Sequence, residues 1–156
     1  MQQQDEKTFK DVEGMLYAYK RAKADAFDIG LEIEELREEV KGITGKGNNE
    51  IMQSSPTNKI SDPVVDEVLR KEEEIERLLS IKRGKERYVA KIDNMLTILN
   101  DEERSFIDLK YIQGQKVKII EHALGLTRDG LSSKRKVIIN DLVNFLNNTK
   151  NTQKTH

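Results

Sequence analysis

The segment from Leu99 to Leu146 alternates helix-forming stretches with glycine turns, and this order constrains the fold more than any other feature of the sequence. Asn100, followed three residues later by Glu103, is a capping-box pattern that starts a helix with three acidic residues in its first turn. Gly114 and Gly125 then end two apolar stretches, as is typical of helices that close in a left-handed turn. The segment therefore predicts three helices joined by short turns.

Each of these three helices has one apolar side suited to packing. The third is expected to begin near Arg128, with Thr127 as its cap, because the Thr127 side chain can accept from the free backbone amides of the first turn. The residues expected to face inward are Phe106, Ile107, Leu109, Tyr111 and Ile112 in the first helix, Val117, Ile119, Ile120, Ala123 and Leu124 in the second, and Leu131, Val137, Ile138, Leu142, Phe145 and Leu146 in the third.

Apolar residues recur with seven-residue spacing over the first forty positions, which predicts a long helix of the coiled-coil type. A second amphipathic stretch runs from about Pro63 to Leu99, with Ser61 or Asp62 as its N-cap. The two heptad rows of the first helix are Val12, Tyr19, Ala26, Ile33 and Val40, and Met15, Ala22, Ile29 and Leu36.

The apolar pattern of the second long helix is interrupted at its centre. Lys82 and Lys85 stand at positions where apolar residues are expected, and Gly84 lies between them. We therefore expect a weak point, a kink or a polar layer there.

The sequence predicts an all-α protein with a long antiparallel helical hairpin or coiled coil followed by a helix-turn-helix. Residues 1–98 would form the coiled-coil and oligomerisation region, with a flexible loop over about 42–61, which is rich in Gly, Asn, Ser and Pro. Residues 99–148 would form a DNA-binding domain, and 149–156 a disordered tail. The heptads allow the long helices to pair within one chain or between chains.

Charge is distributed unevenly along the chain. The net charge is −1, but the segment from Lys110 to Lys136 holds seven basic residues against two acidic ones, which favours contact with nucleic acid there. Cysteine is absent, which excludes disulfides, thiolate zinc sites and a cysteine nucleophile. We find no phosphate-binding loop, no nucleophile–base pair and no apolar run long enough for a membrane span. We expect no enzymatic activity, cofactor or metal, and a cytoplasmic protein.

In a helix-turn-helix, the leading turns of the third helix reach base edges while flanking cations hold phosphates. Arg128 and Arg135 are the best candidates for bidentate contacts to guanine or phosphate, and the hydroxyls of Ser132 and Ser133 could donate to phosphate or a base. The full set of expected DNA-contacting residues is Lys116, Lys118, Thr127, Arg128, Asp129, Ser132, Ser133, Lys134, Arg135 and Lys136.

The same segment resembles region four of sigma-70 family factors. That region normally has a small residue four positions before the turn glycine, where this chain has Glu121. With the coiled-coil half in front of it, the chain resembles the small late-transcription regulators of Gram-positive phages and prophages, of the RinA and ArpU type. The matching residues are Glu103 and Arg104, Tyr111 with Gly114, Leu124 with Gly125, and Leu131.

The resemblance implies a phage late-gene activator that binds double-stranded DNA. The N-terminal helices would assemble the chain into a homo-oligomer or present a surface to host RNA polymerase, and no membrane is involved. One alternative is a viral small terminase subunit, which also pairs a helix-turn-helix with oligomerising helices but serves genome packaging. The other is an interaction protein that binds polymerase or a sigma factor without binding DNA.

Overall fold

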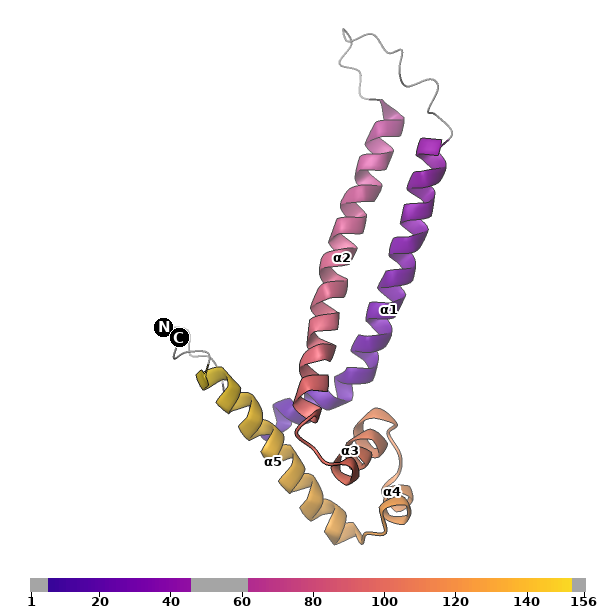
Figure 1. Ribbon diagram of the computed structural model, residues 1–156. Coiled ribbons are helices and arrows are strands. Elements are labelled where there is room, and N and C mark those ends of the chain that lie inside the picture. The colour runs from indigo at the N-terminus through magenta and orange to yellow at the C-terminus, as the bar shows by residue number, and fades with distance from the viewer. Residues whose placement is uncertain (1–5, 46–61, 153–156) are drawn as a thin grey trace. The chain divides into compact units, whose positions relative to one another are not determined.

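The structure is a computed structural model that describes residues 6–45 and 62–152, and every regular element in these two ranges is helical. This confirms the predicted all-α class. The elements are α1 (Phe9–Gly45), α2 (Pro63–Leu96), α3 (Asp101–Ile107), a π-helical turn η2 (Asp108–Ile112), α4 (Val117–Leu124) and α5 (Arg128–Thr152), and Figure 1 labels the five α-helices.

The chain forms two compact units. Unit 1 contains the described residues of Met1–Ala22 and Arg87–His156, and unit 2 contains those of Lys23–Glu86. The two long helices therefore contribute to both units. The predicted boundary between residues 98 and 99 falls inside unit 1, because the first turns of α1 and the last turns of α2 pack with α3, α4 and α5.

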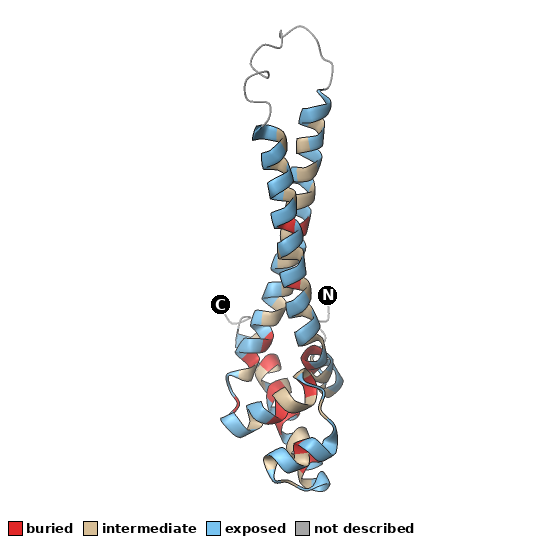
Figure 2. Cartoon of the chain, turned by 90° about the vertical axis from the view of Figure 1, so that its right-hand side faces the viewer, coloured by how far each residue is buried: buried red, intermediate tan, exposed pale blue. Residues whose placement is uncertain are grey.

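Unit 1 has a continuous apolar core of fifteen buried residues drawn from α1, the α2 end and the three C-terminal helices. In Figure 2 the buried residues gather where these shorter helices lie. The core residues are Val12, Met15, Leu16, Ile92, Met95, Leu99, Phe106, Ile107, Tyr111, Ile120, Leu131, Ile138, Ile139, Leu142 and Leu146.

Polar contacts also join the N-terminal end of the chain to α5. The side-chain amide of Asn147 accepts a hydrogen bond from the Lys7 backbone N–H at 3.0 Å and donates to the Lys7 carbonyl at 3.2 Å. Thr8 then caps α1, because its hydroxyl accepts from the Asp11 N–H while the Asp11 carboxylate accepts from the Thr8 N–H. The hydrogen bonds that the Asp11 carboxylate accepts from the Thr8 N–H and from the Thr8 hydroxyl lower the pKa of Asp11. The start of α1 is thus held by hydrogen bonds within its first turn and by hydrogen bonds to Asn147 of α5.

The described part of unit 2 consists of antiparallel segments of α1 and α2. Lys71 Nζ lies 2.5 Å from the Glu39 carboxylate, and Lys85 Nζ lies 3.5 Å from Asp25, so positions that rise along α1 meet positions that fall along α2. No heptad position of the predicted α1 rows is exposed, in either unit. Among the described residues of unit 2, however, only Ala26, Ile33 and Leu78 are buried.

The interruption at the centre of α2 is a polar layer within a continuous helix. Lys85 pairs with Asp25, and the aliphatic part of Lys82 lies beside Gly30, where an added Cβ would meet Lys82 Cε at 3.2 Å. Gly30 therefore leaves room for the lysine stem. The stem covers apolar surface while its ammonium pairs with Glu86 at 2.5 Å.

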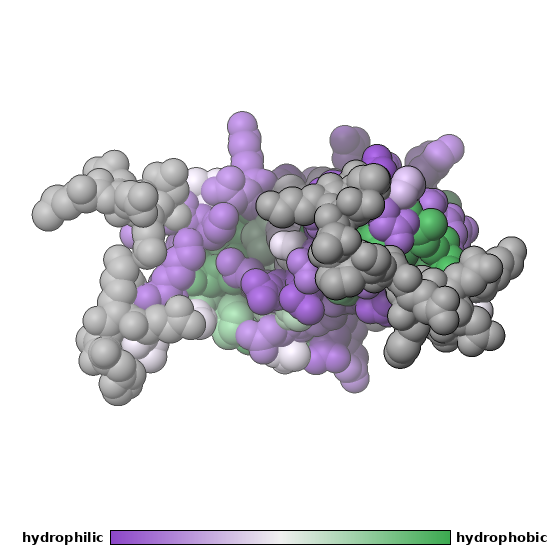
Figure 3. All heavy atoms as spheres, turned by 90° about the horizontal axis from the view of Figure 1, so that it is seen from above, coloured by the Kyte–Doolittle hydropathy of each residue, from purple (hydrophilic) through white to green (hydrophobic). Residues whose placement is uncertain are grey.

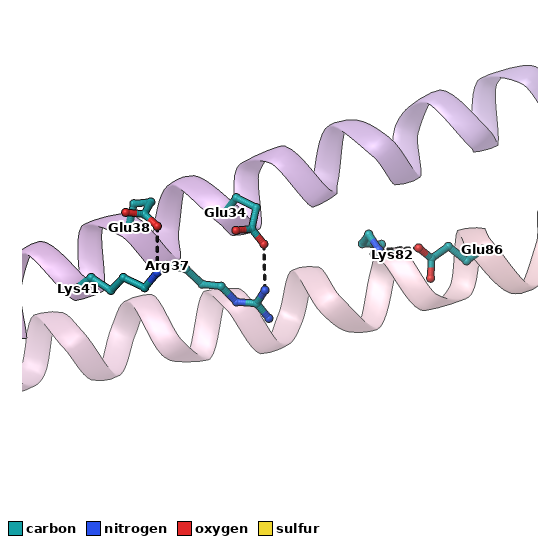
Figure 4. Close-up of polar contacts among 6 residues, drawn as sticks. All are labelled: Glu34, Arg37, Glu38, Lys41, Lys82 and Glu86. Carbon is teal, nitrogen blue, oxygen red and sulfur yellow. Dashed lines mark hydrogen bonds and ion pairs between the residues drawn. The ribbon is translucent and has the colours of Figure 1, made fainter.

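Solvent-facing charges of unit 2 pair along each helix. Figure 4 shows Arg37 with Glu34 and Lys41 with Glu38 on α1, and Lys82 with Glu86 on α2. These pairs are three or four residues apart, the spacing that places two side chains on one helix face. Seen from above in Figure 3, hydrophilic side chains dominate the described surface, with hydrophobic atoms visible between them.

Several helix ends differ from the predicted ones. α2 ends at Leu96, three residues early, and the chain then turns through hydrogen bonds from the Thr97 N–H to the Asn94 carbonyl and from the Leu99 N–H to the Leu96 carbonyl. α5 continues through Thr152, where a disordered tail was expected from residue 149, and the Thr149 hydroxyl donates to the Phe145 carbonyl within it. α1 likewise extends to Gly45. Ser61 and the remainder of the predicted loop, 46–61, lie outside the described residues, as does 153–156.

Candidate nucleic-acid interface

Local interactions at the α4–α5 corner set where α5 begins. Gly125 closes α4 in the left-handed conformation (φ +64°), and its N–H donates to the Glu121 carbonyl. The Thr127 hydroxyl then accepts from the Gly130 N–H at 3.1 Å, which confirms the predicted cap of α5. Arg128 therefore occupies the first position of α5. The capping box of Asn100 and Glu103 that starts α3 is confirmed in the same way.

The predicted contact residue Arg135 is held by a distant carboxylate. Its Nε and Nη2 donate to the two oxygens of Glu13 at 3.0 and 2.8 Å, so the pair is bidentate. The Tyr111 hydroxyl donates to Glu13 as well, at 2.6 Å, and the guanidinium lies 5.2 Å from the Phe9 ring centre. We call Phe9, Glu13, Tyr111 and Arg135 the Glu13 cluster. It joins α1, η2 and α5 within unit 1.

The Glu13 cluster is only partly accessible to water, since the Glu13 side chain is 15% exposed and that of Arg135 is 35% exposed. Burial by itself raises the pKa of Glu13, but the hydrogen bonds from Arg135 and Tyr111 outweigh it and the pKa lies below its usual value. Burial and the Glu13 carboxylate raise the pKa of Tyr111, and the hydrogen bond to Glu13 raises that of Arg135. All three groups thus keep their ordinary charge states near neutral pH, and Glu13 neutralises Arg135.

Lys134 is the second predicted contact residue with a partner in the fold. Its Nζ lies 2.6 Å from the Glu102 carboxylate of α3, and its side chain is only 20% exposed. Within the part of the chain that the structure describes, Lys116, Lys118, Arg128 and Lys136 form no ion pair, and all four are exposed. Exposed unpaired cations therefore remain at the start of α4, at the first position of α5 and two turns further along.

The remaining predicted contact residues are exposed, apart from the capping role of Thr127. Asp129, Ser132 and Ser133 all lie in the first turns of α5 with accessible side chains. Asp129 is placed where the helix dipole favours an acid, which accounts for its position without any ligand. Neither serine hydroxyl makes a hydrogen bond within the described residues, so both are available to donate to a ligand.

The apolar side of α5 was predicted with one error. Val137, expected to face inward, is 59% exposed, and Ile139, which was not expected there, is fully buried. Val117 and Ile119 of α4 are also 45% and 48% exposed, and Ala123 of the same helix is exposed, contrary to prediction. Ile119 lies in a helix of eight residues, which has too few turns for its apolar side to be located from the sequence. Val137 and Ile139 lie on the long helix α5, whose inward side depends on the helices that pack against it. Exposed valine and isoleucine side chains therefore flank the unpaired cations.

Sequence reasoning missed the Glu13 cluster entirely. Glu13 and Arg135 are 122 positions apart, and Glu13 falls outside both heptad rows. Its capacity to neutralise a cation of α5 follows only from the way the first turns of α1 pack in unit 1. A single sequence carries no signal that could have paired these two residues.

Comparison with known proteins finds no matching family model, no matching curated protein and no matching solved structure. In residues 6–45 and 62–152, no helix combines the length and apolar character needed to cross a bilayer. The same residues contain no convergent group of three acidic or histidine side chains that could hold a metal ion.

Proposed function

We propose that this chain is a sequence-specific DNA-binding transcription regulator that inserts the first turns of α5 into the major groove of double-stranded DNA. The observation that carries the proposal is the division of cations at the α4–α5 corner. Arg135 and Lys134 are neutralised by Glu13 and Glu102, while Lys116, Lys118, Arg128 and Lys136 are exposed and unpaired within the described residues.

In this proposal α4 supplies phosphate contacts, and α5 supplies the base contacts and one further phosphate contact. Lys116 and Lys118, at the start of α4, hold phosphates and set the register of the protein on the duplex. Arg128, Ser132 and Ser133 reach base edges from α5. Lys136 adds a phosphate contact, and Arg135 acts as a positioning residue that fixes α5 through Glu13.

The biological setting is part of the same proposal and rests on the resemblance to sigma region four and to phage late regulators. The protein would act in the cytoplasm of a bacterial host as a late-gene activator. Further copies of the chain and host RNA polymerase are its proposed protein partners.

The test compares two neighbouring lysines of α5 that differ only in their partners. Binding of a selected DNA duplex is measured by fluorescence anisotropy at several salt concentrations, since each phosphate contact adds about one to the slope of log affinity against log salt. Lys136→Gln should lower that slope by about one, because Lys136 is unpaired. Lys134→Gln should leave it nearly unchanged, because Glu102 already neutralises Lys134.

Three results would count against the proposal. If the chain does not bind duplex DNA even at low salt, the proposed function is excluded. If it then binds polymerase, the interaction-protein alternative is selected. Equal effects of Lys134→Gln and Lys136→Gln would show that DNA senses only total charge. A stable ring of many subunits in solution would favour the terminase alternative.

A further inference from the structure

Unit 1 contains a small open cavity between the C-terminal helices that neither the core nor the proposed DNA contacts fill. Its volume is about 150 Å³. Its apolar walls are Phe106, Ile120 and Leu131, which are 2%, 2% and 6% exposed, together with Val117 at the mouth. A preformed cavity with buried apolar walls of this kind accepts an apolar group of about benzene size.

The polar lining of the cavity is entirely cationic or neutral. Lys110, Arg128, Ser132 and Arg135 complete the wall, and the lining contains no carboxylate. Arg135 is already neutralised by Glu13, and Lys110 lies 5.6 Å from the Tyr111 ring centre. Arg128, at the first position of α5, has no ion pair among the described residues. The mouth therefore has positive charge that an incoming ligand could neutralise.

The walls of the cavity are held in place by contacts outside it. The bidentate pair with Glu13 fixes the Arg135 side, and the capping interaction of Thr127 fixes the position of Arg128 on the other side. A ligand thus meets a largely preformed site, which reduces the ordering that binding requires.

We infer that this cavity is a docking site for an acidic segment of a partner protein that inserts one large apolar side chain, with neighbouring carboxylates placed against Arg128 and Lys110. Apolar walls select the inserted side chain, and the cationic mouth selects its acidic flanks. The inference goes beyond DNA binding and does not depend on it. Since the segment would cover Arg128 and Ser132, its binding would block those two side chains from any other ligand.

The experiment uses the full chain labelled with ¹⁵N and a synthetic pentapeptide that has one phenylalanine between two aspartates on each side. We expect peptide-induced shifts of the backbone amides of Val117, Ile120 and Ser132, which line the cavity. Replacing the phenylalanine of the peptide by alanine should raise the Kd at least about tenfold, because the buried ring supplies most of the affinity. Replacing the aspartates by asparagines should also weaken binding.

Two variants of the protein separate the cavity from general charge attraction. Arg128→Gln should raise the Kd of the peptide about threefold, the effect of losing one exposed charge pair. Lys136→Gln removes a charge from the same helix at a residue that does not line the cavity, and it should change the Kd less than Arg128→Gln does. Circular dichroism confirms that both variants keep their helix content.

The inference is overturned by any of four results. The alanine peptide could bind as tightly as the phenylalanine peptide, Lys136→Gln could weaken binding as much as Arg128→Gln, or the shifts could lie away from the cavity. It is also overturned if a DNA duplex, and not the peptide, shifts the amides of Phe106 and Ile120. Because the peptide titration contains no DNA, failure of the proposed DNA binding leaves its outcome unchanged.

Discussion

Units 1 and 2 both use α1 and α2, yet they are stabilised in different ways. Unit 1 adds three further helices and a fifteen-residue apolar core, whereas the described part of unit 2 buries only Ala26, Ile33 and Leu78. Two helices alone have one shared face, so most of their surface stays in water. The comparison teaches that the heptad pattern sets which side of a helix turns inward, while the number of neighbouring helices sets how deeply it is buried.

This difference has a consequence for local stability. Segments with few buried apolar contacts open at lower free energy than the core of the same protein. We therefore expect amide exchange to be faster in unit 2 than in the parts of α1 and α2 that belong to unit 1. The substitutions described next test whether units 1 and 2 are stabilised in these different ways.

The largest effect is expected from matched phenylalanine substitutions in the two units. Phe106 is 2% exposed in unit 1, and Phe27 is 70% exposed in unit 2. Phe106→Ala should lower the free energy of unfolding by about 4 kcal/mol, because it leaves a cavity in the core. Phe27→Ala should change it by less than about 0.5 kcal/mol in urea titrations followed by circular dichroism at low protein concentration. A large effect at Phe27 would show that this face is buried against another molecule.

A smaller loss is expected when the Glu13 cluster is disrupted. Glu13→Gln removes the charge from three hydrogen bonds made by Arg135 and Tyr111, and it should lower the free energy of unfolding by about 2 kcal/mol. Glu35→Gln, an exposed glutamate on the unit 2 part of the same helix, is the control and should have almost no effect. Equal losses would mean that Arg135 is stabilised without Glu13.

The stability difference between the natural chain and the Glu13→Gln variant is expected to depend on pH. The folded pKa of Glu13 lies below its ordinary value of 4.5, so the carboxylate stabilises the fold above that pH. As the pH falls from about 4.5 through the folded pKa, protonation removes this contribution. The difference in unfolding free energy between the natural chain and Glu13→Gln should therefore shrink toward zero in urea titrations at decreasing pH. A difference that persists in acid would contradict the assignment.

The smallest effects are expected from two similar ion pairs, one in each unit. Lys134 pairs with Glu102 at 2.6 Å in unit 1, and Lys71 pairs with Glu39 at 2.5 Å in unit 2; the two lysines are 20% and 22% exposed. Double-mutant cycles should give small and equal coupling energies for both, because each carboxylate is more than half exposed. A much larger coupling in unit 2 would show that ion pairs replace the missing apolar core there.

Local features of the fold could be read from the sequence because their causes lie within a few residues. Asn100 with Glu103, Gly125 and Thr127 form the predicted capping interactions, and Asp62 accepts from the Val64 N–H at the start of α2. These contacts span at most a turn, so residue type and spacing are sufficient to predict them.

Deeper burial could not be predicted with the same accuracy. Val137 and Ile139 differ by two positions on α5, and which of them faces inward depends on how α5 packs against α1 and α3. For the candidate site, the sequence located the cationic segment and the first position of α5. It could not separate the unpaired Lys136 from the neutralised Lys134.

The sequence by itself determined an all-α protein, the starts of α3 and α5, the glycine that ends α4, and a local excess of cations near α5. Only the tertiary structure decided which of those cations remain available, because Glu13 lies 122 positions from Arg135 and reaches it through the packing of α1 in unit 1. The physical reason is the separation along the chain over which each interaction acts. Caps and turns act over neighbouring residues, whereas neutralisation of a charge requires a partner that folding alone brings close.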